Sequence, residues 1–228
     1  MLQSLDFISE QQLSEWIRQH VQTDQYALSS GYQGKTLLYQ ENNHKLVIKV
    51  PLGNFLTRPL NRALLRHEYR IYQKLAGMTA VPHCYGMANN ECLVLEFIEG
   101  RTIRQQRPAT DSDFYNKLLA AIREMHTRGV AHFDLKRKEN LLVTADERPV
   151  IIDFGVAVYR KGGLHLLNRY LFNLALKFDY NAYARHKYNR RMEHISEQDR
   201  AYYNKTAIEI ISKKIKRFYK DRILQIFK

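Results

Sequence analysis

Residues 130–143 and 150–155 contain four polar side chains whose types and spacing suit the transfer of a phosphoryl group. They are a carboxylate, an ammonium, an amide and a second carboxylate: Asp134, Lys136, Asn140 and Asp153. A carboxylate can orient and deprotonate a hydroxyl, and a cation can neutralise charge on the phosphoryl group that moves to it. An amide and another carboxylate can hold Mg²⁺. Short apolar runs flank these residues, which predicts loops between buried strands.

The order of these residues resembles the catalytic loop of protein kinases. His132, Asp134 and Asn140 follow the pattern His-x-Asp with a later Asn, and Asp153 begins an Asp-Phe-Gly triplet. The resemblance implies that Asp134 is the base, that Lys136 contacts the γ-phosphate of ATP and that His132 supports the loop. It also implies that Asn140 and Asp153 hold Mg²⁺.

The catalytic stretch departs from the kinase pattern in two ways. Phe133 stands where the pattern has an arginine that commonly reads a phosphate on the activation loop, and no serine or threonine occurs from residue 153 to residue 195. Phosphorylation of Ser or Thr in that segment therefore cannot switch the protein, so we expect a constitutively assembled site. Asn140 follows Asp134 by six residues, where the pattern has five.

Upstream, the alternation of apolar and polar residues predicts strands over residues 26–30, 35–40 and 45–50. Gly31 and Gly34 lie between the first two, where backbone N–H groups could close over phosphates, although an ordinary hairpin turn has the same composition. Lys49 shares a strand face with the apolar Val47, which favours an interior position. The resemblance to the kinase Val-Ala-Ile-Lys strand implies that Lys49 binds the α- and β-phosphates of ATP.

A helix is predicted from residue 59 or 61 to about residue 76, with Glu68 on the same stripe as Leu64 and Ile71. A carboxylate on a buried face requires a partner, and Lys49 is the natural one, although a surface arginine would also serve. Residues 91–98 form a buried-type strand. By resemblance to the segment joining the kinase lobes, the backbones of Glu96 and Ile98 would hydrogen-bond adenine.

Two further helices are predicted from their capping residues. Ser9 and Gln12 form a capping box before a short helix, and residues 110–113 cap a helix that leads into the catalytic stretch. Together these elements predict an α+β, two-lobed protein-kinase-like fold. Residues 1–98 would form an antiparallel-sheet N-terminal lobe, and residues 99–228 an abbreviated helical C-terminal lobe.

The chain has no Ala-Pro-Glu motif, and its second lobe is short. In these two respects it resembles atypical bacterial kinases of the lipopolysaccharide-core and RIO-like group. That resemblance implies ATP and Mg²⁺ as cofactors and a heptose or Kdo sugar of lipopolysaccharide as acceptor, at the cytoplasmic membrane face. A RIO-like or Bud32-like protein kinase, which could bind RNA, is the main alternative. A pseudokinase and a small-metabolite kinase are two further ones.

The net charge of +13 is concentrated in the last third of the chain, where residues 154–228 contribute +11. This asymmetry indicates an anionic partner: a membrane surface, an anionic glycolipid or a nucleic acid, unless it is only a solvated basic face. Residues 164–178 fit either a membrane-interface helix or a core helix, and residues 196–227 fit an amphipathic helix or helix pair. No signal peptide or membrane span is evident, so we expect a cytoplasmic protein, peripheral on the inner membrane, with Cys84 and Cys92 reduced.

Overall fold

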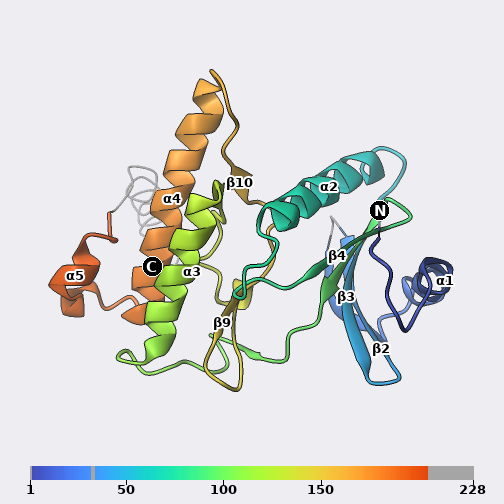
Figure 1. Ribbon diagram of the computed structural model, residues 1–228, viewed down its shortest axis with the longest axis horizontal. Coiled ribbons are helices and arrows are strands. Elements are labelled where there is room, and N and C mark those ends of the chain that lie inside the picture. The colour runs from blue at the N-terminus through green and yellow to red at the C-terminus, as the bar shows by residue number, and fades with distance from the viewer. Residues whose placement is uncertain (1, 32–33, 205–228) are drawn as a thin grey trace, which may run out of the picture.

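The computed structural model describes residues 2–31 and 34–204, and its ribbon divides into a sheet-rich part and a helical part (Figure 1). The sheet-rich part contains five antiparallel strands flanked by α1 and α2. The helical part is built on α3 and α4. The predicted fold class is therefore confirmed.

The five-stranded sheet has the order β1-β2-β3-β5-β4. Its strands are β1 Ala27–Gly31, β2 Gly34–Glu41, β3 His44–Pro51, β4 Cys84–Ala88 and β5 Cys92–Glu96. The first three agree with the predicted strands to within one residue at each end. The strand predicted over residues 91–98 is β5, whereas β4 was not predicted from the sequence.

The two faces of this sheet are covered by different helices, which follows from the alternation of side chains along β3. Leu46, Ile48 and Val50 pack in one cluster with α1 (Glu10–His20), whose capping box at Ser9 is present as predicted. The intervening residues Val47 and Lys49 face the other way, toward α2 (Arg58–Lys74). The strand therefore presents one polar side chain, Lys49, to the interior.

The helical part begins with β6 (Arg101–Thr102) and α3 (Asp113–Thr127), which is capped by Ser112. Short strands follow: β7 Val130–Ala131, β8 Leu141–Val143, β9 Pro149–Ile151 and β10 Val158–Tyr159, with a 3₁₀ turn, η1 Lys138–Asn140, before β8. Strands β6, β8 and β9 form one sheet, and β7 pairs with β10. The lobe boundary predicted after residue 98 would fall between β5 and β6, and it stays a prediction.

Helix α4 (Leu166–Lys187) runs beside α3, and its N-terminal end projects beyond α3 at the top of the view (Figure 1). Phe172, Ala175, Ala182 and Tyr183 are buried along its length. Most of α4 is therefore a core helix, while its first two turns are exposed. Among residues 2–31 and 34–204, none of the helices has the length and apolar character needed to traverse a bilayer.

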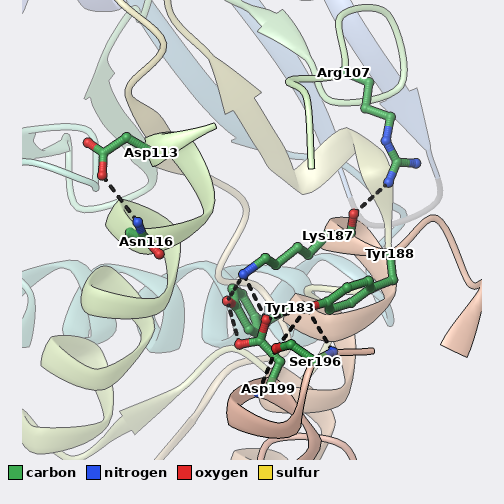
Figure 2. Close-up of polar contacts among 8 residues, drawn as sticks. All are labelled: Arg107, Asp113, Asn116, Tyr183, Lys187, Tyr188, Ser196 and Asp199. Atoms are coloured by element: carbon green, nitrogen blue, oxygen red, sulfur yellow. Dashed lines mark hydrogen bonds and ion pairs between the residues drawn. The ribbon is translucent and has the colours of Figure 1, made fainter. Parts of the chain in front are cut away.

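The 3₁₀ turn η2 (Met192–His194) follows α4, and a buried polar cluster joins α4 to the next helix, α5 (Glu197–Arg200). Figure 2 shows Lys187, Tyr183 and Tyr188 around the carboxylate of Asp199, at 2.7, 3.0 and 2.6 Å respectively. Burial would raise the pKa of Asp199, but hydrogen bonds from these three side chains and the charge of Lys187 hold it below its usual value. The amphipathic segment predicted over residues 196–227 lies outside the described residues from residue 205 onward.

Candidate active site

Three charged side chains from distant parts of the chain meet between the two parts of the fold. The Lys49 Nζ atom on β3 lies 2.6 Å from Glu68 Oε1 on α2 and 2.9 Å from Asp153 Oδ1 in the loop after β9. Burial would lower the pKa of Lys49, but the two carboxylates more than compensate and raise it. The ammonium therefore stays charged, and the predicted pairing of Lys49 with Glu68 is present.

Asp153 is held in an uncommon backbone conformation at the start of Asp-Phe-Gly. Its φ is 65°, a left-handed value that a non-glycine residue adopts only when its surroundings enforce it. The next N–H, of Phe154, donates to Glu68 Oε1 at 3.2 Å, and the Phe154 ring is fully buried. Burial would raise the pKa of Asp153, but the charge of Lys49 lowers it overall.

A cavity of about 630 Å³ opens beside this cluster. Among its lining residues are Gly31, Gly34, Lys49, Glu68 and Asp153, so five of the predicted site residues share one hollow. Such a volume suits a nucleotide-sized ligand.

The two glycines of the predicted phosphate loop differ in whether a side chain would fit at their positions. A Cβ atom at Gly34 would lie 2.4 Å from the Val50 carbonyl oxygen, so the close approach of β2 and β3 demands glycine there. Among residues 2–31 and 34–204, a Cβ atom at Gly31 would meet no atom within 4 Å. Gly34 is thus explained by packing, whereas packing alone does not account for Gly31.

The catalytic stretch is anchored by a buried aspartate that the sequence analysis did not single out. Asp179 of α4 accepts hydrogen bonds from the His132 N–H at 2.7 Å and from the Phe133 N–H at 2.8 Å. His126 of α3 lies 3.0 Å from the same carboxylate. Asp179 is the only Asp or Glu between residues 154 and 192. This isolation is the one feature of the sequence that could have identified it.

The extra residue between Asp134 and Asn140 is accommodated without separating them. The 3₁₀ turn Lys138–Asn140 shortens the path, and Asn140 Nδ2 donates to the Asp134 carbonyl at 3.1 Å. The Asn140 carbonyl in turn accepts from the Ile152 N–H at 3.0 Å, next to Asp153. The longer loop therefore still places Asn140 beside both aspartates.

The side chains around Asp134 are basic and accessible. Arg137 Nε lies 3.8 Å from Asp134 Oδ2, and Arg137 also lines the cavity. Lys136 is exposed, beside Asp134 in sequence. A negatively charged group that entered here would meet two cations next to a carboxylate.

An interior cluster of rings connects α2 to the catalytic stretch. The ring of Tyr72 on α2 meets that of Phe154 edge-on, with centroids 5.1 Å apart, and the tilted His132 ring lies 4.9 Å from that of Phe154. His132 Nε2 is also 3.0 Å from the Ile152 carbonyl oxygen. His132 is completely buried, next to Phe154 and the Ile152 carbonyl.

Two predicted adenine contacts, Glu96 and Ile98, are not among the described residues that line the Lys49 cavity. The Glu96 N–H donates to the His83 carbonyl at 2.8 Å, and its carboxylate accepts from the His83 N–H at 2.9 Å. Ile98 is half-buried.

Comparison with known protein families agrees with this geometry. The family model described as "Protein kinase domain" matches residues 24–173, which is more than half of the chain and includes β1 to the first turns of α4. The chain belongs to the protein kinase family. Proteins of this family use ATP and Mg²⁺.

Two curated protein kinases are each similar to more than half of this chain. "Serine/threonine-protein kinase D" of Synechocystis sp. is 26% identical over 155 residues, which cover 61% of this chain and 31% of the relative. "Maternal embryonic leucine zipper kinase" of Xenopus tropicalis is 35% identical over 138 residues, or 54% of this chain and 20% of the relative. The match therefore spans less than a third of the length of either relative.

The kinase match ends at residue 173, six residues before Asp179. The anchoring of the catalytic stretch by α4 is therefore known from the structure alone. The departure at Phe133 also finds its explanation there, because the Phe133 ring packs against Phe178 of α4, with centroids 5.2 Å apart. An aromatic contact stands where the kinase pattern has an arginine.

Proposed function

We propose that this protein transfers the γ-phosphoryl group of ATP to a hydroxyl group. The observation that supports this most strongly is the convergence of Lys49, Glu68 and Asp153 on one cavity, with Asp134 and Asn140 next to it. A half-buried lysine held by two carboxylates, beside a nucleotide-sized hollow, is suited to binding phosphates.

Each predicted residue has a role in this proposal. Lys49 binds the α- and β-phosphates, Glu68 positions Lys49, and the backbones at Gly31 and Gly34 cover the phosphates. The carboxylate of Asp153 and the amide oxygen of Asn140 are hard oxygen ligands of the kind Mg²⁺ prefers. Bound Mg²⁺ would neutralise charge on the β- and γ-phosphates. The Glu96 carbonyl and the Ile98 backbone would contact adenine.

The acceptor is activated by groups of the catalytic loop. Asp134 orients the acceptor hydroxyl and takes its proton, a contribution of about 10²–10⁴ in rate for a well-placed base. Lys136 compensates the charge that develops on the transferred phosphoryl group. His132, buried between Phe154 and Asp179, positions the loop and does not touch the reactants.

For the acceptor, we propose a lipopolysaccharide core sugar, heptose or Kdo, at the cytoplasmic face of the inner membrane. Two observations support an anionic, non-peptide acceptor: Lys136 and Arg137 beside Asp134, and a link of only ten residues between Gly155 and the start of α4. The basic C-terminal third would hold the anionic glycolipid or membrane surface. The alternative is a RIO-like or Bud32-like serine/threonine protein kinase that could bind RNA. The names of the curated relatives favour a serine/threonine protein kinase.

Phosphotransfer from radiolabelled ATP tests the reaction, with deacylated lipopolysaccharide core and a mixed Ser/Thr peptide library as the two acceptors. We expect label on the core sugar in wild type and a loss of at least about 10²-fold in Asp134→Asn. Asp111→Asn, an exposed aspartate on the same part of the fold, is the matched control. Equal turnover in wild type and Asp134→Asn would refute the base assignment, and label on peptide alone would favour the alternative.

A further inference from the structure

The projecting end of α4 carries a cluster of exposed apolar side chains that the catalytic site does not use. We call residues 160–171 the α4 tip. Leu164 is 94% exposed, Leu166 and Leu167 are each 73% exposed, and Tyr170 is 63% exposed. Single exposed apolar residues are ordinary, but a continuous group of this kind marks a surface that binds something.

The charged residues within the α4 tip are all basic. Arg160, Lys161 and Arg169 are exposed within the α4 tip, and no Asp or Glu occurs from residue 154 to residue 178. The rim of a surface that binds another protein commonly carries charges of both signs. Apolar side chains at a projecting end, interspersed with basic residues alone, are instead complementary to an anionic lipid surface, where the apolar side chains enter the interface and the cations meet head groups.

We propose that the α4 tip docks on an anionic lipid bilayer. The biological use of this contact rests on the proposed function, because it would bring the kinase to a membrane-bound acceptor. Leu164, Leu166 and Leu167 would enter the interface, Tyr170 would lie at head-group level, and Arg160, Lys161 and Arg169 would contact anionic head groups.

The α4 tip is tied rigidly to the strands beside the catalytic loop. Asn168 Nδ2 donates to the Tyr159 carbonyl of β10 at 3.1 Å, and the Lys161 N–H donates to Asn168 Oδ1 at 2.8 Å. The Arg160 guanidinium lies over the Phe172 ring.

Below the α4 tip, the same helix reaches the catalytic stretch itself. Phe172 and Ala175 pack with Ala131 of β7, and Phe178 contacts Phe133, the residue before Asp134. A bilayer bound to the α4 tip would therefore hold Asp134 at a defined height above the membrane. This would also explain the contact of Phe133 with α4, since that contact joins the catalytic loop to the helix that docks on the bilayer.

Co-sedimentation of the full chain with lipid vesicles tests the proposal. One set of vesicles is pure phosphatidylcholine, and the other contains about 30% phosphatidylglycerol, enough to give a negative surface. We expect binding to the anionic vesicles to exceed binding to the neutral ones and to weaken as salt is raised. The double variant Leu166→Ser/Leu167→Ser should bind the anionic vesicles at least about tenfold more weakly, because two apolar anchors are lost.

The matched control is Phe55→Ser/Leu56→Ser, which removes two apolar side chains that are 90% and 79% exposed on the sheet-rich part of the fold. This control should bind vesicles as wild type does. Equal losses in the two double variants, or no binding by wild type, would overturn the proposal. A concentration-dependent dimer in gel filtration that Leu166→Ser/Leu167→Ser abolishes would also overturn it, because the surface would then belong to a second copy. Asp134→Asn should bind vesicles normally, so failure of docking and failure of the proposed reaction are distinguishable.

Discussion

Replacement of Asp179 tests how the catalytic stretch is held in place. In Asp179→Ala, the backbone N–H groups of His132 and Phe133 lose their acceptor inside the protein. Each buried donor left without a partner costs about 1–3 kcal/mol, so the two together predict a loss of about 4 kcal/mol in the free energy of unfolding. In Asp179→Asn the side chain keeps one oxygen for one of the two N–H groups, but it faces the other N–H with an NH₂ group. This predicts a loss of about 2 kcal/mol in the free energy of unfolding.

Urea unfolding followed by circular dichroism measures both losses, with Asp111→Asn as the exposed control expected within about 0.5 kcal/mol of wild type. Turnover should fall further than stability explains, because Asp134 follows the two N–H groups directly. The KM for ATP should change little, since Lys49 and Asp153 are not touched by the substitution. An Asp179→Asn protein with wild-type stability and turnover would refute the anchoring argument.

Three further predictions follow from contacts within and around the site. Glu68→Gln should lower kcat/KM by about 10²-fold, because the amide holds Lys49 less firmly, whereas Glu124→Gln on the surface of α3 should not. Arg137→Gln should raise the KM for an anionic acceptor by about tenfold and leave the KM for a neutral sugar unchanged, since only the charge-assisted contact is removed. Equal effects on both acceptors would contradict a contact between Arg137 and the anionic acceptor. Asp199 has a pKa below its ordinary value of 3.8 in the folded protein, so it stabilises the fold above that pH and the contribution disappears as the pH falls through the folded value. The stability difference between wild type and Asp199→Asn, measured by thermal unfolding at several pH values, should therefore be full at neutral pH and shrink in acid.

The sheet and the central polar cluster could be predicted because local signals determine them. Strands β2 and β3 alternate in burial and are separated by turn residues, and Asn42 and Asn43 adopt the positive φ that a tight hairpin requires. Lys49 could be assigned to the interior because it shares a face with Val47. Strand β4 was missed because Gly86 interrupts its pattern and shifts its register with β5.

Features that depend on tertiary packing could not be read from the sequence. Asp179 looks like an ordinary polar residue of a helix until α4 is placed against the N–H groups of His132 and Phe133. The sequence left two interpretations of residues 164–178 open for the same reason. Apolar periodicity does not say which turns of a helix a neighbour will cover, and here α3 and β7 cover the later turns and leave the α4 tip exposed.

The most direct test of the central claim is the Mg²⁺ dependence of ATP binding, measured by calorimetry alongside turnover. The account predicts that Asp134→Asn binds ATP with Mg²⁺ within about twofold of wild type but has lost turnover, since Asp134 acts on the acceptor. Asp153→Asn should lose the Mg²⁺-dependent part of the affinity. If Asp153→Asn kept that dependence, or Asp134→Asn kept full turnover, Lys49, Asp134 and Asp153 would not form one phosphotransfer site.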